Sequence, residues 1–123
     1  MDSPRKQHIP FYLNRFDEEP GYFNLPLKVR HHWLPRLFHA GARHVFSGHL
    51  HYNCTATWLP GPGISESLEL VTTSSTGAQL GSDAPGFRLI SLDPHSARLR
   101  HRYFALSEAE ALVADGRSIC IDS

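Results

Sequence analysis

Hydrophobic positions in the first third of the chain follow the period of a helix. Between residues 26 and 39, apolar side chains recur every three or four residues, which predicts one amphipathic helix with these side chains in the core. The apolar positions are Val29, Trp33, Leu34, Leu37 and Phe38. Gly41 is suited to the left-handed backbone that commonly ends a helix. Pro35 has no N–H to donate, so we expect a kink or a break at that point.

Farther along the chain, the pattern changes to that of β-strands. Short apolar or alternating runs, separated by polar turns that contain Gly or Pro, predict strands. These runs cover residues 43–47, 52–59, 68–74, 87–92 and 97–104. Ser107 and Glu110 have the spacing of a capping box, which predicts a short helix from there to about Ala114. The order of a helix, several strands and a small helix indicates an α/β fold in which helices cover a sheet.

Length and charge restrict the classes of protein that fit this chain. It has 123 residues, the length of one small domain, and its 12 basic and 12 acidic residues cancel. This balance argues against a nucleic-acid binder, and no run of like charges predicts a membrane partner. Residues 1–7 are polar, are expected to be loose, and lack the apolar stretch of a signal peptide. Cys54 and Cys120 do not form the pattern of a disulfide scaffold and indicate a reducing compartment.

Nine histidines point to imidazole as the group on which chemistry depends. His49 and His51 stand one residue apart, directly after an apolar run and Gly48. In a regular strand both side chains would point toward one metal ion, whereas in a turn they can reach two. His8 begins a short apolar segment, residues 8–13. Neutral imidazole is a common ligand of transition metals, so the three histidines predict a metal site.

Other interpretations of these histidines stay open at the level of sequence. Neither motif has a carboxylate nearby, and residues 17–19 form an acidic stretch that we interpret as a solvated rim. With His8 and Cys54, the His49/His51 pair could instead hold a structural zinc ion, although the spacing matches no common zinc finger. The remaining histidines are expected to be structural or solvated; they are His31, His32, His39, His44, His95 and His101.

Two of these segments resemble metal motifs of a known enzyme family. Residues 48–51 (Gly-His-Leu-His), with residues 40–47 before them, resemble the last metal motif of the calcineurin-like metallophosphoesterases. Residues 7–10 (Gln-His-Ile-Pro) resemble the motif that precedes it. The segments 74–81 and 101–103 extend the resemblance, which covers about residues 7–110 and points to a cytosolic serine/threonine phosphatase within the family.

The resemblance implies both a fold and a reaction. The fold would be a four-layer αββα sandwich, with residues 8–114 as its C-terminal half and residues 115–123 as a tail. The reaction would be hydrolysis of phosphorylated proteins in the cytoplasm by water that two divalent ions of the Mn, Fe or Zn class activate. By the same resemblance, His8 and His49 would bind the second ion and His51 the first. No catalytic residue is assigned to this chain, and no nucleic-acid or membrane partner is expected.

Several motifs of the family are missing from the sequence before His8. The family also uses Asp-x-His, Gly-Asp-x-x-Asp and Gly-Asn-His motifs, which supply the bridging Asp, an Asn ligand and the His that protonates the leaving group. None of these precedes His8. We therefore expect half of an active site, a chain that is inactive alone, and a Met1 that lies inside a longer gene product. The alternative hypothesis is a non-catalytic binding module or truncated isoform that binds a partner or a single metal ion.

Overall fold

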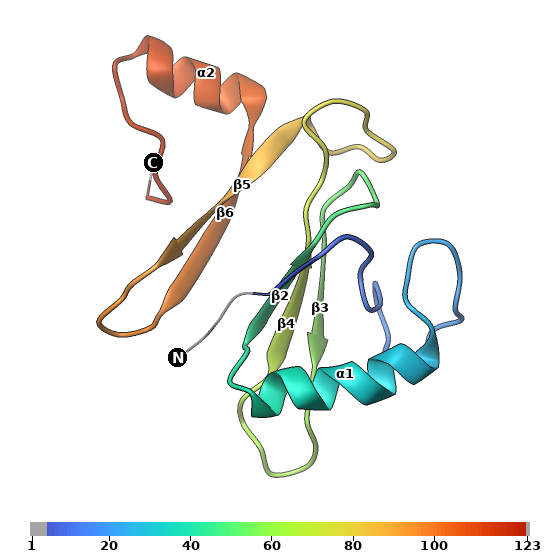
Figure 1. Cartoon of the computed structure of the whole chain (residues 1–123). Helices are drawn as coiled ribbons and strands as arrows, with labels where there is room; N and C mark the ends of the chain where they lie inside the picture. The colour runs from blue at the N-terminus through green and yellow to red at the C-terminus, as the bar shows by residue number, and fades with distance from the viewer. Residues whose placement is uncertain (1–4, 123) are drawn as a thin grey trace.

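The computed structural model describes residues 5–122 and confirms an α/β fold with mixed sheets. Its elements are β1 (Arg5–Gln7), α1 (Leu27–His39), β2 (His44–Ser47), β3 (Cys54–Trp58), β4 (Leu68–Thr72), β5 (Gly86–Leu92), β6 (Leu99–Ala105) and α2 (Leu106–Ala114). The five predicted strands and both predicted helices are present within a few residues of the expected bounds. Figure 1 shows the strands at the centre, α1 at one end and α2 at the other.

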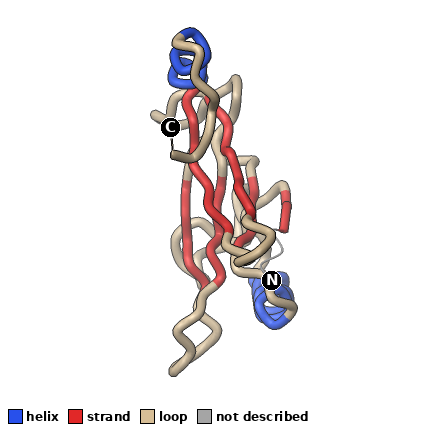
Figure 2. The backbone as a smooth tube through the Cα atoms, turned by 90° about the vertical axis from the view of Figure 1, so that its left-hand side faces the viewer, coloured by secondary structure: helices blue, strands red, loops and turns tan. Residues whose placement is uncertain are grey.

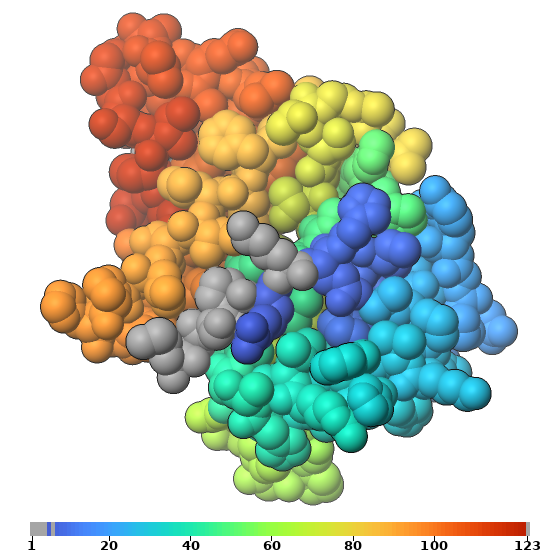
Figure 3. All heavy atoms as spheres, in the orientation of Figure 1, coloured from blue at the N-terminus to red at the C-terminus, as the bar shows by residue number. Residues whose placement is uncertain are grey.

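The strands form two separate sheets. In the four-stranded sheet the order is β1-β2-β4-β3, where β1, β2 and β4 run parallel and β3 is antiparallel to β4. In the second sheet, β5 and β6 make a two-stranded antiparallel hairpin. The tip of this hairpin projects beyond the rest of the molecule, in orange at the left of Figure 3. The small size and mixed sheet fit a part of the sandwich that the sequence predicts.

Alternation along the strands places α1 and the hairpin on opposite faces of the four-stranded sheet. Val45 and Leu70 are paired in register and pack with Leu34 of α1 in the main core. The next residue, Phe46, points to the other face because strand side chains alternate. There its ring lies 5.4 Å from the ring of His101 on β6. The side view in Figure 2 shows the resulting layers.

The helix α1 buries most of the predicted apolar stripe: Leu34 and Phe38 are buried, and Val29 and Leu37 are partly buried against the core. Its buried residues are Arg30, Leu34 and Phe38, whereas Trp33 is 49% exposed. The expectation that Trp33 belongs to the core is therefore wrong. Arg30 was not predicted to be buried, and its guanidinium donates to three backbone carbonyls in the interior.

The helix is continuous through Pro35, and its end is as predicted. The expected break does not occur, since α1 runs from Leu27 to His39. Proline removes a single intrahelical hydrogen bond, and buried Phe38, one turn later, holds the last turn on the core. Gly41 has a φ of 95° and donates to the Phe38 carbonyl, while Ala42 donates to that of Leu37. This is a Schellman motif, the left-handed stop that the sequence indicates.

Two further expectations are corrected at the ends of the chain. Of the residues expected to be loose, residues 1–4 lie outside the described part, but Arg5–Gln7 form β1 and pair with Val45–Ser47. An edge strand needs only backbone partners, so polar side chains are tolerated there, and Arg5 is exposed.

The predicted capping box is also absent. The N-cap of α2 is Ala105, which makes no side-chain hydrogen bond, and Ser107 lies inside the first turn. The helix starts directly from the end of β6, and the Leu106 N–H is satisfied by the Pro85 carbonyl at 2.8 Å.

Across the described residues, neither helix is long and apolar enough to cross a membrane.

Candidate metal centre

The first candidate site forms where the ends of β1 and β2 lie side by side. The N–H of Gly48 donates to the His8 carbonyl at 3.0 Å, which continues the parallel pairing of the two strands. This places the side chains of His8 and His49 together. His49 Nδ1 lies 3.3 Å from His8 Nε2, and the ring centroids are 5.0 Å apart.

The two nitrogens are within hydrogen-bond distance, and the orientation of the His49 ring also allows a cation between them. His49 Nε2 lies 3.1 Å from the Tyr22 carbonyl. Because a carbonyl only accepts, Nε2 carries the hydrogen, and Nδ1 presents a lone pair toward His8. Metal-bound histidines are commonly held in this way through their second nitrogen. Two nitrogens on one tetrahedral ion at about 2.0–2.1 Å would be about 3.3–3.4 Å apart, so the observed spacing fits a shared ion.

The turn that presents the histidines is held in a costly backbone conformation. His49 has a φ of 71° and His51 a φ of 57°, both in the left-handed region that L-residues avoid. Such residues cost about 1–3 kcal/mol each and concentrate at functional sites. Leu50 between them is fully buried and donates to the Gly48 carbonyl at 2.8 Å, which anchors the turn. The surrounding structure therefore holds His49 and His51 in a backbone conformation that is locally unfavourable.

His51 does not lie close enough to His8 and His49 for all three side chains to bind one ion. Among the described residues, the three side chains are not a group whose ligand atoms all lie within 4.8 Å of one another. His51 Nδ1 is buried without a hydrogen-bond partner, and a buried polar atom of this kind is suited to bind an ion. The alternative of one zinc ion shared with Cys54 is not supported, because the thiol donates to the Leu13 carbonyl at 3.2 Å. Burial, with a smaller effect of Glu18, also raises the pKa of Cys54.

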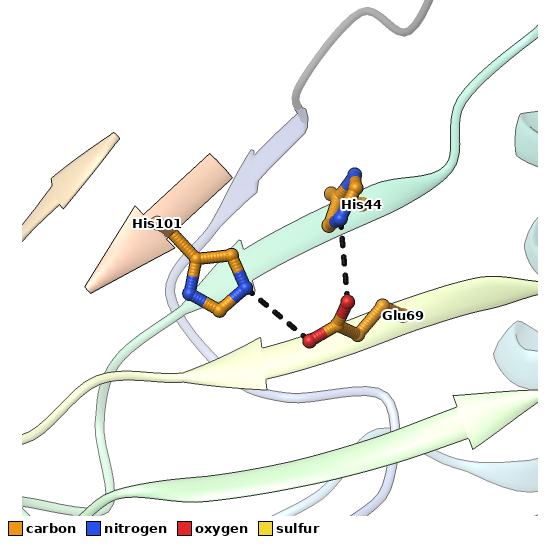
Figure 4. Close-up of side chains that lie close together, drawn as sticks. All are labelled: His44, Glu69 and His101. Carbon is orange, nitrogen blue, oxygen red and sulfur yellow. Dashed lines mark hydrogen bonds and ion pairs between the residues drawn. The ribbon is translucent and has the colours of Figure 1, made fainter. Parts of the chain in front are cut away.

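A second group of possible ligands lies between the two sheets, away from the predicted motifs. His44 of β2, Glu69 of β4 and His101 of β6 have ligand atoms within 4.8 Å of one another (Figure 4). Glu69 lies 3.3 Å from His44 Nε2 and 3.2 Å from His101 Nε2. By spacing alone, this group could hold a metal ion. The sequence did not indicate it, because only the register His44↔Glu69 and the packing of the hairpin bring it together.

Hydrogen bonds give this second group a structural role, because they join the hairpin to the four-stranded sheet. Arg88 Nη1 lies 2.9 Å from His101 Nδ1, and since a guanidinium only donates, that nitrogen accepts. The hydrogen of neutral His101 is therefore on Nε2 and is donated to Glu69. If Nε2 of neutral His101 bound a metal ion, the hydrogen would have to be on Nδ1, where Arg88 donates. Arg88 would therefore have to move away first. Burial lowers the pKa of His101, and the charges of Arg88 and His44 add to this effect against the opposing one of Glu69.

Arg88 also connects the hairpin to the histidine turn. Its Nε donates to Thr73 Oγ1 at 2.9 Å, and its Nη2 donates to Asn53 Oδ1 at 3.2 Å. Asn53 comes two residues after His51, and its N–H is held by Asp83 at 2.7 Å. The segment between β4 and β5 thus packs against the turn and helps to fix it, a contact that sequence reasoning missed.

Comparison with known proteins finds curated relatives that are similar to most of this chain. It is 39% identical over 102 residues to the serine/threonine-protein phosphatase CPPED1 of Mus musculus and 38% identical to that of Danio rerio. The identity to the Homo sapiens protein is 37% over 103 residues. CPPED1 is calcineurin-like phosphoesterase domain-containing protein 1. The predicted resemblance to the calcineurin-like phosphoesterases is confirmed.

The similarity covers 83% of this chain but 30% of each relative, so the chain spans less than a third of the length of the curated relatives it matches. No family model matches the chain, and no solved structure matches it significantly.

Proposed function

We propose that this chain is the C-terminal, metal-binding part of a serine/threonine protein phosphatase. The observation that carries the proposal is the His8–His49 pair, whose nitrogens are 3.3 Å apart at the ends of two parallel strands. The similarity to phosphatases named CPPED1, over 83% of this chain, agrees with this role. The substrate would be a phosphorylated protein and the location cytoplasmic, as the family resemblance implies.

Each histidine has a separate task in this proposal. His8 and His49 share one divalent ion, with the His49 ring oriented by the Tyr22 carbonyl. His51 serves a second ion through its buried, unpartnered Nδ1. Two such ions, when bound, activate water and stabilise the charge that develops on the phosphoryl group. The identity of the ions as Mn, Fe or Zn follows from the affinity of imidazole for such metals.

The described residues do not supply a complete two-metal centre. No carboxylate joins His8 and His49 in a group of three ligand atoms within 4.8 Å among the described residues. A bridging carboxylate is needed to hold two ions close together, so further ligands are required for hydrolysis. This absence also favours the alternative function, a non-catalytic module that binds a partner or one ion.

The test compares the chain alone with a chimera. In the chimera, the part of the Mus musculus relative that precedes the match is joined before Gln7. We expect Mn²⁺-dependent hydrolysis of an aryl phosphate and of phosphoserine peptides by the chimera and none above background by the 123-residue chain. His49→Ala should abolish the chimera's activity, and Val113→Ser on α2 is the control. A folded chimera that binds Mn²⁺ but hydrolyses neither substrate would favour the binding module.

A further inference from the structure

The loop before α1 is a fixed structure, although it has no helix or strand. Arg30 is fully buried, and its guanidinium donates to the carbonyls of Phe16, Glu18 and Leu25 at 2.7–2.8 Å. These bonds fasten both ends of the loop to the helix. The loop forms the right-hand edge of the molecule in Figures 1 and 3, drawn in light blue.

A second set of hydrogen bonds closes the loop from inside. The Glu18 carboxylate accepts backbone N–H groups of residues 13–15 at 2.7–3.0 Å, and the Asn24 amide donates to its other oxygen at 2.8 Å. Burial alone would raise the pKa of Glu18, but these hydrogen bonds lower it. Asn24 also accepts the Gly21 N–H at 2.8 Å, so the two residues between them are held in a tight turn.

Those two residues are aromatic and face solvent beside the His8–His49 pair. Tyr22 is 76% exposed and Phe23 is 41% exposed. Their rings are 5.1 Å apart, and each contacts the imidazole of His49, at 4.8 Å for Tyr22 and 6.0 Å for Phe23. The Tyr22 carbonyl accepts the His49 N–H at 3.1 Å. Two apolar rings are thus presented on a rigid loop in direct contact with a proposed metal ligand.

We infer that Tyr22 and Phe23 form an aromatic wall beside the His8–His49 pair, and that this wall binds an aromatic residue next to the phosphorylated residue of a peptide substrate. The inference rests on the proposed function and adds a substrate preference to it. Consecutive peptide residues are about 3.8 Å apart at Cα, so a flanking side chain can reach a ring that touches the metal ligand. The loop is already ordered, so little conformational entropy is lost when a ring packs on the wall.

The expected size of the preference follows from the strength of aromatic pairs. Such pairs add enough free energy for roughly a two- to tenfold gain in affinity beyond the area that they bury. The wall should therefore distinguish peptides with aromatic flanks from those with small polar flanks, while phosphate recognition stays with the ions that the histidines are proposed to bind.

Four peptides test the inference on the 123-residue chain with Mn²⁺, by calorimetry. They have the sequence Ala-Xaa-Ser-Xaa-Ala with Xaa either Phe or Ser, and each is used with and without phosphate on the central serine. We expect the phosphorylated Phe peptide to bind roughly two- to tenfold more tightly than the phosphorylated Ser peptide. In the double variant Tyr22→Ser/Phe23→Ser this ratio should fall to about one.

Val113→Ser is the matched control, since Val113 is 60% exposed on α2 and should leave the ratio as in the wild type. Phe23→Leu, which keeps an apolar side chain, should retain part of the preference, and circular dichroism checks that each variant is folded. Equal affinity of the wild type for both phosphopeptides, or a preference that survives in the double variant, overturns the inference. If the preference for Phe over Ser flanks is the same with and without phosphate, the result counts against the proposed function but still supports binding of aromatic residues by Tyr22 and Phe23.

Discussion

His8 Nε2 and His49 Nδ1 lie 3.3 Å apart although 41 positions separate the two residues in the chain. The distance is set by backbone pairing, since Gly48 donates to the His8 carbonyl. A pair fixed by two parallel strands is preorganised, so binding an ion requires little movement. This is the arrangement expected of a ligand pair that has to hold its geometry during a reaction.

We predict that His8 and His49 act as one unit in metal binding. In the chimera, His8→Ala and His49→Ala should each remove one equivalent of Mn²⁺, and the double variant should lose no more than either single variant, because residues that act as a unit are non-additive. His51→Ala should remove a different equivalent and add its own loss to that of His8→Ala. Bound metal per chain, from elemental analysis after dialysis, gives the answer. Loss of two equivalents in the His8/His49 double variant would show that these histidines do not share an ion.

We predict that Arg30→Met destabilises the protein by about 3 kcal/mol, since a buried charged donor and three carbonyl bonds are lost together. The change should also release the loop before α1, because Phe16, Glu18 and Leu25 lose their common partner. Urea unfolding measures the free energy. Arg36→Met is the control on the same helix, where an exposed guanidinium donates to one carbonyl. Equal destabilisation by both substitutions would contradict the role given to Arg30.

Gly86 is expected to tolerate no side chain. A Cβ at this position would lie 2.1 Å from the Phe104 carbonyl oxygen and 2.7 Å from the ring of Tyr103, so the hairpin would have to separate there. We predict that Gly86→Ala costs about 2 kcal/mol or more of unfolding free energy. Gly77→Ala is the matched control, because a Cβ there meets nothing within 4 Å. Thermal melts of the two variants that coincide would disprove the clash.

Stability should fall as the pH is lowered below the ordinary range of histidine, in part through His101. Its pKa in the folded state is lower than the usual 6.5, so the unfolded chain binds more protons as the pH drops through about 6.5. The contribution is present above that pH and is lost below it. Protonation would also place a positive charge against Arg88, which donates to His101.

The measurement is the unfolding free energy between pH 7 and pH 5. His101→Gln should reduce its dependence on pH, whereas His95→Gln, in the exposed turn of the hairpin, should leave the dependence unchanged. An unaltered pH dependence in His101→Gln would show that another group is responsible.

Both helices and every strand except β1 could be predicted, in order, from local sequence patterns. Helical spacing between residues 26 and 39, the Gly41 stop and the alternating runs are local patterns, and local backbone preferences suffice to express them. The pairing of residues 48–51 with residues 7–10 was also predictable, but only through a family resemblance.

Tertiary structure decided which residues are buried and which charged groups meet. Trp33 was a reasonable core residue by spacing, yet Arg30 takes the interior because the loop carbonyls lie there and need a donor. Glu69 and His101 come together because a hairpin folds back on the sheet, and their separation in sequence gives no sign of it. Contacts of this kind depend on register and on the packing of distant segments. A single sequence does not specify these locally, whereas the period of a helix or strand is contained in neighbouring residues.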